Sequence, residues 1–127
     1  MPPYPAEHVP DEDELYLRVH QNNLQPRGEL HPGIFREHNS GMSTDWSHYA
    51  TPEETRQRAT SPPELNGVVS LPVGGVRALE GLTVDHDPLP DNRAHTEVHG
   101  GAALVKARLK LLRICTEEIP VPWPPAA

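Results

Sequence analysis

Residues 82–99 read LTVDHDPLPDNRAHTEVH. Apolar and polar residues alternate at both ends of this segment, which is the period of a half-buried strand. The prolines and the Asp-Asn pair between the two ends are typical of a tight connection. We therefore predict a strand over residues 82–86, a turn over 87–92 and a further strand over 94–99. Residues 85–99 also hold three His and four carboxylate side chains, which makes them the part of the chain richest in reactive groups.

The segments on either side of this hairpin predict the remaining elements. Residues 102–115 repeat apolar side chains on one broad face and predict an amphipathic helix. Residues 14–20 and 67–71 have the composition of short strands, whereas residues 21–50 lack a sustained period and predict a long loop. The expected fold is α+β: a small mixed sheet of three to five short strands, with the C-terminal helix packed on one face.

A second helix is predicted after Thr51. Thr51 is a good N-cap, the proline that follows it needs no backbone N–H at that position, and Glu54 completes a capping box. The two prolines at 62 and 63 end this helix by about residue 60. Its surface is almost entirely polar, so we expect it to pack weakly.

The composition predicts a small core between two extended ends. The 127 residues suit one domain, but only 35% are hydrophobic and 16 are proline. Many prolines lie near the termini. We expect a disordered acidic, proline-rich arm over residues 1–13, a single α+β domain over 14–116 and a proline-rich tail over 117–127.

The charge and cysteine content exclude several classes of protein. A net charge of −7 argues against nucleic-acid binding, which requires a surplus of Lys and Arg. A single cysteine cannot form an internal disulfide, which suits a reducing cytoplasm. No apolar run approaches the length of a membrane span, so we expect no membrane partner.

Two side chains of the last predicted strand are candidates for a metal site. His95 and Glu97 lie two residues apart, so they project from the same face of a strand and can reach one ion. His86, Asp85 or Asp87, from the preceding strand, is the candidate third ligand, with zinc or another transition metal as the ion. A polar outer face of a sheet produces the same pattern, and on that interpretation the protein has no cofactor.

The turn between these strands is a candidate recognition surface. Asp87, Asp91, Asn92 and Arg93 lie in a connection that two prolines make rigid. Asp91-Asn92 also suits an Asx-turn, in which the side chain accepts a hydrogen bond from a backbone N–H two residues later. The alternative is that these residues only build the hairpin.

Arg108 breaks the pattern of the last helix, because it falls within the apolar face. A buried guanidinium requires a partner. We predict a structural pair between Arg108 and a carboxylate of residues 85–97, with Asp85, Asp87 and Glu97 as candidates. In the alternative, its aliphatic stem lies on the apolar surface and its charge reaches water.

The succession of Arg18, Ser43-Thr44 and Glu97 resembles that of ADP-ribosyltransferases. The resemblance implies that Arg18 grips a phosphate of NAD, that Ser43 orders the site and that Glu97 stabilises the ribosyl transition state. The sequence departs from the pattern of that family at two positions. Residues 41–44 read GMST rather than containing Ser-Thr-Ser, and residue 95, two positions before Glu97, is neither acidic nor Gln.

Residues 15–113 also resemble a group of small bacterial proteins that carry an Asp-Pro-Leu-Pro-Asp-Asn-x-Ala-His segment, here residues 87–95. This resemblance implies a bacterial, cytoplasmic setting and no particular activity. From the sequence we therefore expect a noncatalytic interaction or accessory protein that engages a protein partner. The alternatives are a metal-binding protein or enzyme centred on His95 and Glu97, and an NAD-using enzyme centred on Arg18.

Overall fold

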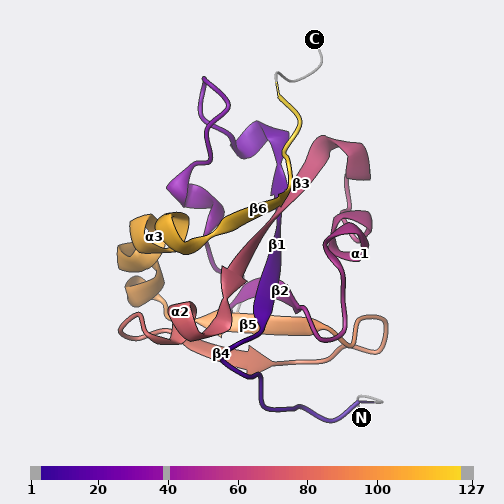
Figure 1. The fold of residues 1–127 in the computed structure, drawn as a ribbon, viewed down its shortest axis with the longest axis vertical. Coiled ribbons are helices and arrows are strands. Elements are labelled where there is room, and N and C mark those ends of the chain that lie inside the picture. The colour runs from indigo at the N-terminus through magenta and orange to yellow at the C-terminus, as the bar shows by residue number, and fades with distance from the viewer. Residues whose placement is uncertain (1–3, 39–40, 124–127) are drawn as a thin grey trace.

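A six-stranded sheet connects almost every part of the chain (Figure 1). The structure is a computed structural model that describes residues 4–38 and 41–123. The strand order is β4-β5-β2-β1-β3-β6, and every pair of neighbouring strands is antiparallel. The strands are β1 (Glu14–His20), β2 (Met42–Trp46), β3 (Asn66–Pro72), β4 (Thr83–His86), β5 (His95–His99) and β6 (Thr116–Ile119).

The predicted mixed sheet of three to five strands is wrong, because two strands form where no strand was expected. β2 lies within the predicted loop of residues 21–50, and four of its five residues are buried. Burial on both faces removes the alternation by which a strand is recognised. β6 has the sequence TEEI and forms an edge of the sheet. Its mostly exposed polar residues likewise gave no strand signal.

The predicted hairpin and both predicted helices are present. β4 and β5 pair along residues 83–86 and 96–99, as the sequence pattern indicated. Thr51 caps α1 (Pro52–Gln57) with a complete capping box, although this helix is shorter than predicted. α2 (Val73–Arg77) is brief, and α3 (Ala102–Ile114) is the longest helix. Short 3₁₀ turns occupy residues 21–23, 32–34 and 63–65.

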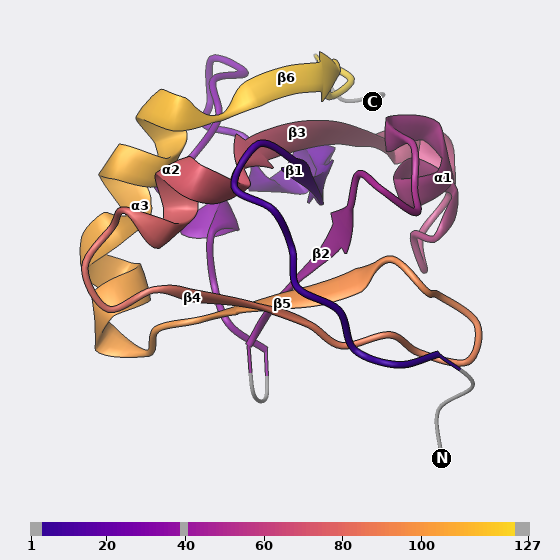
Figure 2. The same cartoon turned by 60° about the horizontal axis from the view of Figure 1, so that its bottom comes forward.

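The two faces of the sheet have different coverings (Figure 2). α3 buries Leu104, Ala107 and Leu111 in the main hydrophobic core. The core side of β1 contributes its alternate apolar residues to the same cluster. α1 contacts β1 and β3, and Arg18 on the opposite side of β1 reaches its backbone. The sheet therefore has an apolar face under α3 and a more polar face toward α1.

The sheet splits between its two middle strands. β1 pairs with β3 from Glu14 to His20, whereas the register between β1 and β2 contains only Leu15 with Trp46 and Tyr16 with Asp45. In Figure 1, β1 and β3 run along the long axis of the molecule while β4 and β5 cross its lower end. The strong twist separates β1 from β2 beyond Tyr16, and a cleft opens there.

The described parts of the two ends pack on the domain. Val9, in the segment predicted to be a disordered arm, is 1% exposed and belongs to the core. Val121, in the predicted tail, is 8% exposed and belongs to the same cluster. The ring of Trp123 lies against Gly28, whose φ of +87° suits glycine and whose Cβ position the ring would occupy. The rest of the predicted arm and tail, residues 1–3 and 124–127, lies outside the described residues.

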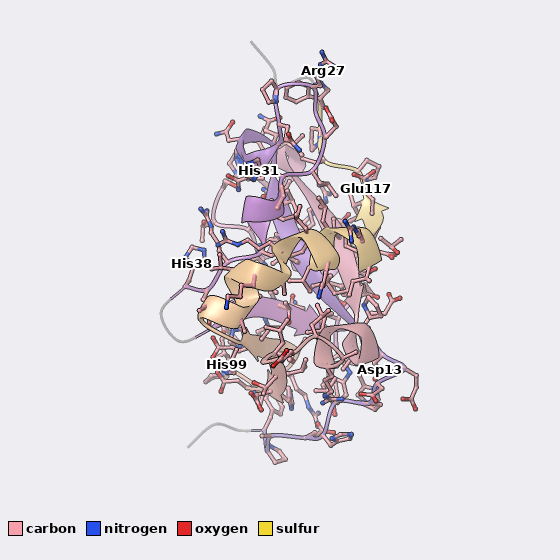
Figure 3. All side chains as sticks on the ribbon, turned by 90° about the vertical axis from the view of Figure 1, so that its left-hand side faces the viewer. Asp13, Arg27, His31, His38, His99 and Glu117 are labelled. Carbon is pink, nitrogen blue, oxygen red and sulfur yellow. The ribbon has the colours of Figure 1, made fainter. Side chains whose placement is uncertain are left out.

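Arg108 is bound differently from the prediction. Its Nε–H donates a 2.7 Å hydrogen bond to the carbonyl oxygen of Phe35, rather than to a carboxylate of residues 85–97. Phe35 is fully buried and follows the second 3₁₀ turn. Figure 3 looks onto α3 from outside, with the sheet behind the helix. Arg108 therefore ties α3 to the connection between β1 and β2.

Candidate functional site

A cleft of about 600 Å³ lies where β1 and β2 separate. Its walls include Leu17 and Met42 from the core side of the sheet, together with Arg18 and Ser43 from the other side. Residues of both faces border it because the opening passes between two strands. This volume is within the range of sites for small molecules, about 300–1,000 Å³.

The cleft carries several positively charged or titratable nitrogen groups. Arg18 projects from β1, and its guanidinium donates a 3.1 Å hydrogen bond to the carbonyl oxygen of Thr55 in α1. Arg36 and His38 reach the cleft from the connection that leads to β2, and His20 comes from the end of β1. The guanidinium groups of Arg18 and Arg36 can recognise phosphate and carboxylate oxygens, and the side chains of Asp45 and Asp91 line the same cleft.

Asp45 organises one wall of the cleft. It is 3% exposed, and its carboxylate accepts hydrogen bonds from the Thr55 hydroxyl at 2.7 Å, from Arg58 at 3.0 Å and from the Asn92 amide at 2.9 Å. These three donors come from α1, the segment after it, and the turn between β4 and β5. A buried carboxylate with three donors is well satisfied, so Asp45 fixes the wall rather than binding a ligand.

Tyr16 adds a neutral hydroxyl to the cleft. Burial raises the pKa of Tyr16, and the carboxylates of Glu14 and Glu118 raise this pKa further. The phenol therefore stays protonated throughout the neutral range, where it can both donate and accept hydrogen bonds.

A short chain of polar groups crosses the mouth of the cleft at β5. Nε2 of His95 lies 3.4 Å from the Ser43 hydroxyl, and Nδ1 of the same ring lies 2.9 Å from the carbonyl oxygen of Asp87. The Asp87 carboxylate is 3.6 Å from this Nδ1. Ser43 is exposed, whereas the His95 side chain is only 15% exposed.

The structure places two of the three residues selected by the resemblance to ADP-ribosyltransferases in one cleft. Arg18 and Ser43 line the same cleft. Glu97 is the register partner of Ser43 on the adjacent strand, so the two side chains project from the same face. Glu97 is half-buried and lies one strand further from Arg18, beside rather than within the lining of the cleft.

The three residues proposed from sequence as metal ligands do not converge. His86 pairs with Thr96 and is buried, so it lies on the face opposite to His95 and Glu97. Its Nδ1 accepts a 3.0 Å hydrogen bond from the Glu7 N–H, and its Nε2 lies 2.7 Å from the Arg93 carbonyl oxygen. Within residues 4–38 and 41–123, no three His, Cys, Asp or Glu side chains are arranged to hold a metal ion.

The four candidates in the hairpin turn have different surroundings. Asp91 and Asn92 line the cleft, and Asn92 accepts a hydrogen bond from the Ala94 N–H, as predicted for an Asx-turn. Arg93 stacks over the rings of Tyr4 and Tyr49, at 4.8 and 4.3 Å from their centroids. Asp87 holds His95 through its backbone. The turn thus contributes to both the cleft and the anchoring of the N-terminal segment.

Several residues that shape the site carry no recognisable sequence pattern, notably Asp45, Thr55, Arg58 and Arg36. Asp45 lies on β2, in the segment that the sequence predicts to be a loop. A short apolar-containing run, MSTDW, was the only available indication of that strand.

Comparison of the chain with family models, curated proteins and solved structures gave no significant match. In the described part of the chain, every helix is too short or too polar to cross a bilayer.

Proposed function

We propose that this protein is an NAD-using enzyme similar to ADP-ribosyltransferases, with its substrate site in the cleft between β1 and β2. One observation carries the proposal: Arg18 and Ser43 line the same cleft, and Glu97 pairs with Ser43 across two strands. These residues are far apart in the sequence. Arg18 and Ser43 meet at a ligand-sized opening and Glu97 lies on the adjacent strand, which supports a shared role.

The chemistry of the site suits the roles that the resemblance implies. The guanidinium of Arg18 can bind a phosphate oxygen of NAD, with Arg36 as a second cation at the same cleft. When the bond between nicotinamide and ribose breaks, positive charge develops on the ribose. A carboxylate at Glu97 stabilises that charge, and the effect is strongest where water is excluded.

The other predicted roles stay proposals. A protein partner, engaged through the turn of residues 87–93, would serve as the acceptor of the ADP-ribosyl group. A bacterial cytoplasmic setting is supported by the single cysteine and by the second resemblance. A noncatalytic interaction role and a zinc site stay predictions.

The proposal is tested by incubating the purified chain with NAD and measuring the nicotinamide released. Glu97→Gln should lower the rate by about 100-fold, the usual effect of removing one electrostatic stabiliser of a transition state. Arg18→Ala should chiefly weaken NAD binding. Glu117→Gln, on the exposed edge strand, is the matched control and should leave the rate unchanged. Absence of NAD binding to the wild-type chain would refute the proposal.

A further inference from the structure

His95 occupies a position that its predicted zinc role does not explain. It projects from β5 beside Ser43, at the edge of the proposed NAD site. Its ring contacts a side-chain hydroxyl through one nitrogen and a backbone carbonyl through the other. These two contacts decide which nitrogen carries the proton.

The carbonyl oxygen of Asp87 can only accept a hydrogen bond, so Nδ1 of His95 must carry a hydrogen to bond with it at 2.9 Å. In the neutral ring, Nε2 then has a free lone pair. This nitrogen is directed toward the Ser43 hydroxyl at 3.4 Å, on the side of the cleft. The fold therefore presents a basic nitrogen at the substrate site.

Carboxylates lie on the elements that adjoin His95. Asp87, from the turn after β4, has its carboxylate 3.6 Å from Nδ1. Asp45 on β2 is the register partner of His95, although its carboxylate is already bound by Arg58. Glu97 lies two residues along β5 on the same face. The charges on β2, on β5 and in the turn are thus acidic, apart from the paired Arg58, whereas Arg18 on β1 and Arg36 before β2 line the same cleft as His95.

We propose that His95 is the general base of the reaction, and that the acceptor it activates is an O–H group, either water or a hydroxyl. This inference rests on the proposed use of NAD. Asp87 and Ser43 act as positioning residues. The Asp87 carbonyl fixes the tautomer of His95, and Nε2 of His95 receives the proton on the side that faces the Ser43 hydroxyl.

The step is balanced without a further reactant. The bond between ribose C1′ and the nicotinamide nitrogen breaks, and its electron pair leaves with nicotinamide, which becomes neutral. A bond forms between C1′ and the acceptor oxygen. The proton of that oxygen moves to Nε2 of His95, and the resulting imidazolium is stabilised by the Asp87 carboxylate.

The kinetic test compares His95→Ala and His95→Gln with His8→Ala, a matched control at an exposed histidine. Loss of a general base typically costs about 100-fold or more in rate. We expect both His95 variants to bind NAD normally and to release nicotinamide about 100-fold more slowly. Added imidazole should partly restore His95→Ala, and the control should match the wild type.

The pH profile separates a chemical role from a structural one. The pH profile of the wild type should have the acidic limb that a general base produces, and this limb should be absent in His95→Gln, which can still donate a hydrogen bond to the Asp87 carbonyl. An unchanged limb in His95→Gln would overturn the assignment.

Products distinguish the two sources of the acceptor oxygen. Reactions in water and in water–methanol mixtures should give ADP-ribose and its methyl riboside, and the rates of formation of both products should fall by the same factor in His95→Ala.

If the wild type cleaves NAD but His95→Ala retains its rate, the His95 inference fails and the NAD proposal stands. If the wild type neither binds nor cleaves NAD, both fail. Nitrogen-15 NMR of the His95 ring checks the geometry separately: a neutral ring protonated on Nε2 would contradict it.

Discussion

The carboxylate of Asp45 lies 3.0 Å from the guanidinium of Arg58, with the two side chains 5% and 31% exposed. This ion pair joins β2 to the segment that follows α1. Thr55 and Asn92 bind the same carboxylate, so one buried group holds together three segments that surround the cleft.

Replacement of Asp45 by alanine should destabilise the fold by about 2–3 kcal/mol, since it leaves three donors without their acceptor. The half-exposed Arg58 can regain contact with water, which keeps the loss below that of a fully buried pair. Urea unfolding measures the change. Glu53→Gln, in the exposed pair with Arg56, is the control and should have no measurable effect. Similar results for both variants would contradict the organising role of Asp45.

Arg108→Ala should cost about 1–3 kcal/mol, because it strands the buried carbonyl of Phe35 and removes a packed aliphatic stem. Lys106 projects from the same helix and is exposed, so Lys106→Ala should change the unfolding free energy by less than about 0.5 kcal/mol. Equal small losses in urea unfolding would show that the contact between Arg108 and Phe35 contributes nothing.

The N-terminal segment should contribute to stability through Val9. Its side chain is 1% exposed, and Val9→Ala should cost about 2 kcal/mol by leaving a cavity in the core. The neighbouring His8 is exposed, so His8→Ala is the control. A melting temperature for Val9→Ala equal to that of the control would agree instead with the predicted disordered arm.

Tyr49 should respond to alkaline pH. Its hydroxyl donates a 2.5 Å hydrogen bond to Glu7, and this bond, followed by burial, raises the pKa of Tyr49 above its ordinary value of about 10. Because the folded state holds this proton more tightly, the stabilisation is present below pH 10 and is lost as pH rises through the raised pKa. Ultraviolet titration should show two late phenols, because the pKa of Tyr16 is raised as well. The one that belongs to Tyr49 should disappear in Tyr49→Phe and shift to lower pH in Glu7→Gln. An unchanged titration in Glu7→Gln would contradict the contact.

The sequence predicted the parts of the fold that have one buried and one exposed face. The β4–β5 hairpin and α3 were recognised because their apolar residues recur with the period of the element. β2 was not predicted because it is buried on both faces. The separation of β1 from β2 depends on the twist of the sheet, which no local sequence pattern indicates. Because β2 lies between β5 and β1, the order of strands there could not be predicted without it.

The candidate site was predictable only where a pattern of residue types identified it. Arg18, Ser43 and Glu97 were selected by resemblance, but their proximity depends on the strand order. Asp45 could not be selected, because its partners lie 10, 13 and 47 residues away in the sequence. The environment of His95 was likewise hidden, since the Asp87 carbonyl that fixes its tautomer is a backbone group and has no sequence signature.

Backbone amide NMR during a titration with NAD shows whether NAD binds between β1 and β2. Binding there should concentrate the shift changes at Arg18 and Ser43, at residues 36–38 and at Asn92. Arg18→Ala should weaken binding strongly, whereas Arg113→Ala, on the exposed side of α3, should leave it unaffected. Saturating shifts confined to α3, or no shifts at millimolar NAD, would contradict binding between β1 and β2.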